Sequence, residues 1–201
     1  MKAREQTVLW GRVTDYLSTR YALIPAVLSP AQRAAAVDWY PSEGRELGAL
    51  ADELGVDREA VIRAAAALSP ATSWAAVKAR LARFIVDARA GERAPSFPAY
   101  GRNRALAARI IRGDAVELTG PKVGPFARNL MGDLWPVTVD RHVVRMALGR
   151  PDRISPTMGE RQVIQQAFAW TANRVNLRPA ELQSLLWVAS VGHGGRYGPK
   201  S

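Results

Sequence analysis

The chain has 201 residues, of which 48% are hydrophobic, so we expect a folded core and not global disorder. It has no cysteine, which excludes disulfides, thiolate metal sites and iron–sulfur clusters, and two histidines supply a histidine metal site poorly. The formal net charge of +10, from 28 Lys and Arg against 18 Asp and Glu, favours nucleic acid as the partner. An Arg- and Ala-rich composition typical of a GC-rich genome would produce the same surplus.

The N-terminus lacks the apolar segment of a signal peptide, and no run approaches the roughly 20 apolar residues that span a bilayer. We therefore expect a cytoplasmic protein with no membrane partner. We also expect a monomer, with no metal ion and no cofactor.

Helical periodicity dominates the chain and strand alternation is nearly absent, so we expect an all-α fold of about ten short helices. Ser29-Pro30 is typical of a helix start, and this helix should end before Pro41. The alanine run that ends at Leu68 predicts a buried helix. The expected helices, in chain order, cover about residues 6–19, 30–40, 43–54, 57–68, 73–88, 102–112, 125 onward, 138–148, 159–175 and 179–190.

Glycine and proline mark residues 90–101 as a loop and as the best candidate boundary between two lobes. A single domain over residues 1–201, with a central cleft between lobes at 1–95 and 96–201, fits the pattern as well as two independent domains. Residues 149–158 are expected to form a second loop, and residues 192–201 a frayed tail.

The most informative segment is Gly120-Pro-Lys-Val-Gly-Pro-Phe-Ala-Arg-Asn129, which is typical of a glycine turn that opens a helix. Gly120 and Gly124 permit backbone conformations that other residues resist, and Pro125 suits the first turn of a helix. Amides at a helix N-terminus can bind a phosphate, with Lys122 and Arg128 adding positive charge. A plain helix–helix turn capped by glycine explains the same spacing.

Three segments together resemble the helix-hairpin-helix superfamily of DNA glycosylases, which has the endonuclease III-like fold. The glycine turn is similar to the family's Leu-Pro-Gly-Val-Gly hairpin. Val139-Asp-Arg-His-Val-Val-Arg145 is similar to its Val-Asp-x-His-Val-x-Arg motif, and Leu68-Ser-Pro-Ala-Thr-Ser-Trp74 to an upstream motif that begins Leu-Ser-x-Gln. The resemblance covers about residues 60–150. It implies a divergent member with two helical lobes, a central cleft and double-stranded DNA as its partner.

The resemblance also implies roles for individual residues, and its essential acid falls on Asp140. Breaking an N-glycosidic bond builds positive charge on the sugar, which a nearby carboxylate stabilises once the nucleotide has left the base stack. Alternatively, Thr138 or Asp140 simply caps the helix expected at 138–148, and the two roles of Asp140 are compatible. The implied phosphate-binding residues are Gly120, Lys122, Val123, Gly124 and Arg128, and the implied base-pocket residues are Thr72, Trp74, Phe126 and His142.

The chain departs from the family at several positions. Bifunctional members carry a nucleophilic lysine two residues after the second hairpin glycine, where Phe126 stands, so we expect no Schiff-base lyase. Ala71 replaces the family's upstream Gln, and the segment from the hairpin to Asp140 is short. Three hypotheses follow: a monofunctional DNA glycosylase-like hydrolase, a base-modifying transferase on the same scaffold, as in thymine hypermodification of phage DNA, and a non-catalytic DNA-binding protein.

Trp74, Trp135 and Trp170 are candidates for stacking on a base, although tryptophan is more often buried. Trp74 is favoured because it lies in the upstream motif. Gln183 and Trp187, on one face of the last expected helix, are expected to pack in the core.

Overall fold

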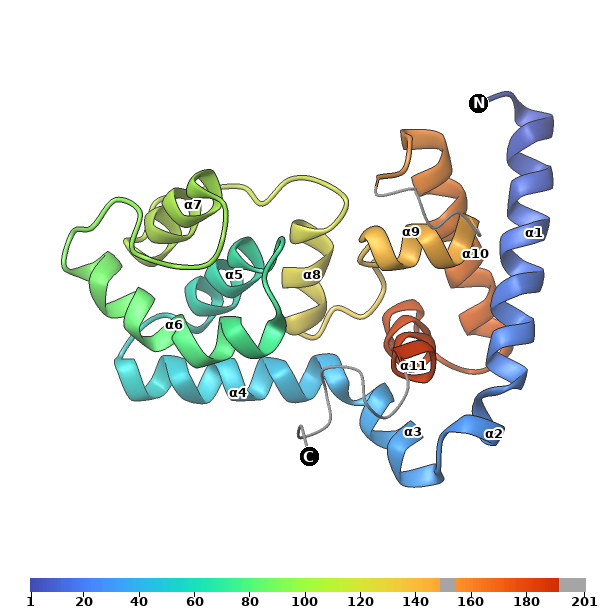
Figure 1. Cartoon of the computed structure of the whole chain (residues 1–201), viewed down its shortest axis with the longest axis horizontal. Coiled ribbons are helices and arrows are strands. Elements are labelled where there is room, and N and C mark those ends of the chain that lie inside the picture. Colours follow the sequence, from blue (N-terminus) through green and yellow to red (C-terminus); the bar gives the residue numbers. More distant parts are fainter. Residues whose placement is uncertain (149–154, 192–201) are drawn as a thin grey trace. The chain divides into compact units, whose positions relative to one another are not determined.

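The computed structural model describes residues 1–148 and 155–191, and within these ranges the fold is all-α (Figure 1). None of the helices in these ranges is both long enough and apolar enough to cross a membrane. The tail expected at 192–201, and residues 149–154 of the loop expected at 149–158, lie outside the described residues. The described part of the chain forms eleven helices: α1 (Ala3–Ala22), α2 (Ile24–Val27), α3 (Pro30–Val37), α4 (Trp39–Leu54), α5 (Arg58–Leu68), α6 (Trp74–Arg89), α7 (Gly101–Ile111), α8 (Val123–Leu130), α9 (Arg141–Leu148), α10 (Met158–Arg174) and α11 (Pro179–Val191).

Most of these helices begin and end near the expected residues because the sequence carries their caps. Asp57 accepts a hydrogen bond from the amide of Ala60 at 2.8 Å, and Ser73 accepts one from the amide of Ala76 at 3.3 Å. Each side-chain oxygen pairs with a first-turn amide that has no acceptor within its own helix.

Two of the helices differ from the expected ones. The helix that starts at Pro30 does end before Pro41, but already at Val37, and Pro41 is the third residue of the next helix, α4, which begins at Trp39 and not near residue 43. First-turn amides have no acceptor within the helix, so a proline without an amide costs little there. The four-residue helix α2 has no counterpart among the expected helices, because so short a segment cannot show a periodic apolar pattern.

The chain divides into two compact units. Unit 1 combines Met1–Tyr40 with the segment that begins at Asp133, and unit 2 is Pro41–Gly132. These units differ from the lobes expected at 1–95 and 96–201, and the loop at 90–101 lies inside unit 2. Glycine and proline mark a turn, but a turn becomes a boundary only where the flanking helices pack with different partners.

In unit 1, α1 runs alongside α10, and α11 packs against both α10 and α3 (Figure 1). The core contains fully buried side chains such as Leu17 and Phe168. It also contains Val137, Val139 and Val144, which lie on either side of Asp140 in the sequence. Burial of these valines holds the segment around Asp140 against the core.

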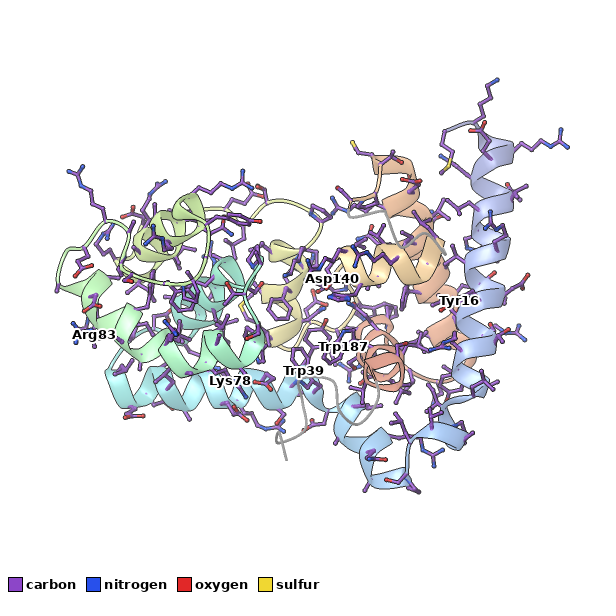
Figure 2. All side chains as sticks on the ribbon, in the orientation of Figure 1. Tyr16, Trp39, Lys78, Arg83, Asp140 and Trp187 are labelled. Carbon is purple, nitrogen blue, oxygen red and sulfur yellow. The ribbon has the colours of Figure 1, made fainter. Side chains whose placement is uncertain are left out.

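In unit 2, α5 packs against α6, α7 and α8 and is buried as its alanine run predicts. Small side chains allow neighbouring helices to approach closely. Lys78 of α6 also ties to α4, with its Nζ 2.9 Å from Glu43 Oε2 and 2.7 Å from Glu46 Oε2 (Figure 2).

Candidate functional site

Asp140 lies directly before α9, at the end of the segment that connects α8 and α9 (Figure 2). Its Oδ1 accepts hydrogen bonds from the amides of His142 and Val143, both at 2.9 Å. Its carbonyl accepts the first intrahelical bond, from the amide of Val144 at 2.9 Å. Asp140 is therefore the N-cap residue of α9, and two charge-assisted bonds fix the direction of its carboxylate.

The second carboxylate oxygen of Asp140 is differently placed. Oδ2 makes no hydrogen bond or ion pair with any residue in the described ranges, and the side chain is half-buried. The capping role that the sequence predicts is thus carried by one oxygen. The other oxygen takes no part in the capping.

Gln183 of α11 holds the segment that leads to Asp140. Its Oε1 accepts from the amide of Thr138 and its Nε2 donates to the carbonyl of Thr138, both at 2.9 Å. The same carbonyl accepts from the amide of Asp140 at 2.9 Å. Gln183 and Thr138 are buried, so the glutamine amide satisfies backbone groups that water cannot reach.

Sequence reasoning missed this role for Gln183, which we expected only to pack in the core. Its neighbours in α11, Leu182, Leu185 and Leu186, are buried apolar residues. A polar amide in such surroundings must find partners, and this requirement was the available signal. Trp187 of the same helix is half-buried, with its ring 6.5 Å from that of Trp39 (Figure 2).

The two glycines of the expected hairpin have different roles. Gly120 has a φ of +94°, the left-handed conformation that glycine adopts without strain. Gly124 lies inside α8, which begins at Val123 and not at Pro125 as expected. A Cβ at Gly124 would lie 2.7 Å from the carbonyl oxygen of Leu118, so this glycine permits close packing and not an unusual turn.

Residues 112–122 connect α7 to α8, so α7 ends well before the glycine turn. The N-cap residue of α8, Lys122, makes no side-chain capping bond. The Nζ of Lys122 donates to the carbonyl of Ser69 at 3.3 Å, which joins the hairpin to the upstream motif. Arg128 is exposed on α8. The helix-hairpin-helix and its phosphate site, Val123 included, stay predictions.

The residues expected to form the base pocket are divided between the units. In unit 2, Trp74 and Phe126 are buried and pack edge to face, with ring centroids 5.2 Å apart. The hydroxyl of Thr72 donates to the carbonyl of Pro98. In unit 1, His142 is exposed in the first turn of α9. The base pocket stays a prediction.

Two arginines follow the acid on α9. Arg141 is exposed and makes no hydrogen bond, ion pair or ring contact with the part of the chain that the structure describes. Arg145 is half-buried. Among the same residues, no group of three or more His, Asp and Glu side chains is placed to hold a metal ion.

Replacing Gln183 with methionine tests the two hydrogen bonds between its side chain and the backbone of Thr138. Gln183→Met keeps a similar volume but leaves the buried amide of Thr138 without an acceptor, so we expect a loss of about 2 kcal/mol in unfolding free energy. Urea unfolding measures this loss. Gln166→Met, on the exposed side of α10, is the matched control and should change stability by less than about 0.5 kcal/mol. Equal stability of the two variants would contradict the assignment.

Replacing Gly124 with alanine tests its close packing. Gly124→Ala should destabilise the protein by about 2 kcal/mol, because the new methyl group meets the carbonyl oxygen of Leu118. Gly11→Ala, also within a helix but with nothing near its Cβ position, should stabilise the protein by up to about 1 kcal/mol. Thermal unfolding of both variants compares them, and a stabilised Gly124→Ala would show that the contact is relieved.

Comparison with known proteins finds one match. No curated protein and no solved structure matches the chain. A family model described as a family of unknown function (DUF7178) matches residues 17–194, which include the glycine turn, Asp140 and Gln183. Because this match covers most of the chain and parts of both units, the protein belongs to the family of unknown function DUF7178.

Proposed function

We propose that the protein is a monofunctional DNA glycosylase-like hydrolase, a divergent relative of the helix-hairpin-helix glycosylases. Its substrate would be a damaged or modified base that leaves the stack of double-stranded DNA, and its reaction the hydrolysis of the N-glycosidic bond. The observation that carries the proposal is the different use of the two carboxylate oxygens of Asp140. Oδ1 caps α9, while Oδ2 makes no hydrogen bond or ion pair with the described residues.

The chemistry needs one fixed carboxylate. As the bond between C1′ and the base weakens, positive charge develops on the sugar ring, and Oδ2 of Asp140 stabilises it. A water molecule then adds to C1′, gives its proton to the carboxylate, and the base leaves with the bonding electrons. Two hydrogen bonds from backbone amides to Oδ1 hold the carboxylate in place before the substrate arrives, so the carboxylate needs little reorganisation.

Gln183 supports this role as a positioning residue. It holds both backbone groups of Thr138, whose carbonyl also binds the amide of Asp140. The acid is thereby connected to α11 through the backbone and not only through its own side chain. A catalytic group held from two directions is kept close to its working geometry.

We propose no lyase activity, and two residues of unit 2 support this. Phe126 occupies the position where bifunctional family members carry their lysine, and it packs against Trp74. The Nζ of Lys122 donates to the carbonyl of Ser69, which ties this amine to the protein backbone. Neither residue offers a nucleophilic amine to the sugar.

Replacing Asp140 with asparagine separates catalysis from capping. Asparagine caps helices as well as aspartate does, so Asp140→Asn should change the unfolding free energy by less than about 0.5 kcal/mol. Without the negative charge, base excision should fall by at least about 100-fold. The measurement is strand scission in hot alkali after incubation with duplexes that carry uracil, 8-oxoguanine, an alkylated base or a hypermodified pyrimidine.

Asp57→Asn is the matched control. Asp57 caps α5 by accepting from the amide of Ala60, so this substitution makes the same chemical change at a cap outside the candidate site. It should leave excision unchanged. Full activity of Asp140→Asn would remove this residue from the mechanism. A changed base mass without scission would indicate a transferase, and DNA binding with no altered substrate would indicate a DNA-binding protein.

The proposed partner predicts a strong dependence of binding on salt, since the chain has a net charge of +10. Arg141→Gln should weaken duplex binding and lower the slope of log affinity against log salt by about 1, because one phosphate contact is lost. Arg83→Gln is the control: Arg83 Nε pairs with Asp87 Oδ1 at 2.9 Å in α6 (Figure 2). Fluorescence anisotropy with a labelled duplex measures both, and salt-insensitive binding by the wild-type protein would contradict the proposal.

A further inference from the structure

Trp135 is the most exposed aromatic residue in the described ranges, with 71% of its surface accessible. Its indole makes no hydrogen bond, ring contact or cation contact with any residue that the structure describes. The other tryptophans favoured as stacking candidates have partners: Trp74 packs on Phe126, and Trp170 packs on Trp10 at 5.3 Å beneath the guanidinium of Arg174. Trp135 therefore differs from them in being mostly exposed and without a partner among the described residues.

The backbone that carries this ring is held on both sides. The amide of Trp135 donates to Asp133 Oδ1 at 3.2 Å, and the carbonyl of Leu134 accepts from the amide of Ala180 at 3.1 Å. Further along, Gln183 binds Thr138. Pro136 restricts the conformation of Trp135 itself. The exposed ring thus lies on a braced segment and not at the tip of an unsupported loop.

The apolar residues beside Trp135 in the sequence do not extend its exposed surface. Its neighbours Leu134 and Val137 point into the core, where they are 3% and 1% exposed. A docking surface for a protein or a membrane needs a contiguous apolar area of several hundred Å². A nucleobase needs a single π-face, and stacking of one base on one aromatic ring contributes about 1–3 kcal/mol.

Trp135 also lies near the candidate acid. Five residues of extended chain place its Cα at most about 18 Å from that of Asp140, which is the rise of about five stacked nucleotides. Arg141, exposed and without a partner among the described residues, lies directly after the acid and carries positive charge suited to phosphate. A DNA strand that contacts Asp140 and Arg141 is therefore long enough to reach Trp135 within about five nucleotides.

We infer that Trp135 is a stacking platform for an unpaired nucleobase of the DNA strand bound at Asp140. The nature of the partner rests on the proposed function, whereas the platform itself rests on the exposure and bracing of Trp135. This inference replaces Trp74, buried in unit 2, as the favoured stacking residue.

The experiment compares substitutions that keep apolar bulk and differ in the presence of a π-face. Trp135→Leu should lower affinity for a labelled duplex with one unpaired nucleotide by about 10-fold, within the range of about 5- to 150-fold that stacking provides. Trp135→Phe should retain most of that affinity. A fully paired duplex of the same sequence should distinguish the variants much less. Trp170→Leu, at the other exposed tryptophan of unit 1, should leave the preference unchanged.

Tryptophan fluorescence supplies a second readout that does not depend on activity. Single-stranded DNA should quench the wild-type protein more than Trp135→Phe, because a stacked base quenches the indole of Trp135. The urea midpoint of each variant at position 135 should match that of the wild type, since the ring packs on nothing in the described ranges.

The outcomes distinguish this inference from the proposed function. Unchanged affinity and quenching in the variants at position 135 would overturn the inference, even if excision by the wild-type protein were observed. Trp135-dependent binding without any Asp140-dependent excision would support the platform and reject the glycosylase. Absence of binding to every duplex and single strand would overturn both.

Discussion

The paired hydrogen bonds between Gln183 and Thr138 join α11 to a segment that has no regular structure of its own. The amide of Thr138 is buried, and its acceptor, Gln183 Oε1, comes from a helix distant in the sequence. The glutamine amide also donates to the carbonyl of Thr138. Without Gln183, the buried amide of Thr138 would lose this acceptor next to the buried Val137 and Val139, and the segment that leads to α9 would be held less firmly.

The two oxygens of Asp140 are used differently, as the proposed chemistry requires. Oδ1 accepts from two first-turn amides of α9, while Oδ2 makes no hydrogen bond or ion pair with the described residues. A capping aspartate is normally a structural feature, and its charge is not needed for that task because asparagine performs it as well. A charge-bearing cap, an exposed arginine and an exposed tryptophan on a held backbone together make the segment from Trp135 to Arg141 the candidate site.

In unit 2, residues of the expected glycine turn have tertiary neighbours that the sequence does not predict. Gly120 adopts the left-handed conformation that the glycine turn predicts. Gly124 is helical, and the need for it comes from the carbonyl of Leu118 in the preceding connection. Similarly, the charge of Lys122 predicts a phosphate contact. In the structure its ammonium group donates to the carbonyl of Ser69, which is far away in the sequence. Local spacing does not contain information about such tertiary partners.

The sequence by itself determined the all-α class and most helix limits, because apolar periodicity and caps such as Asp57 and Ser73 are local signals. It also indicated Thr138 and Asp140 as candidate caps of the following helix, and the structure has Asp140 in this role. Only the tertiary structure decided the division into units at Tyr40 and Gly132, the brace from Gln183, and the contrast between buried Trp74 and exposed Trp135. Each of these depends on which residues distant in sequence meet, and burial of an indole or an amide is a property of that packing and not of its neighbours along the chain.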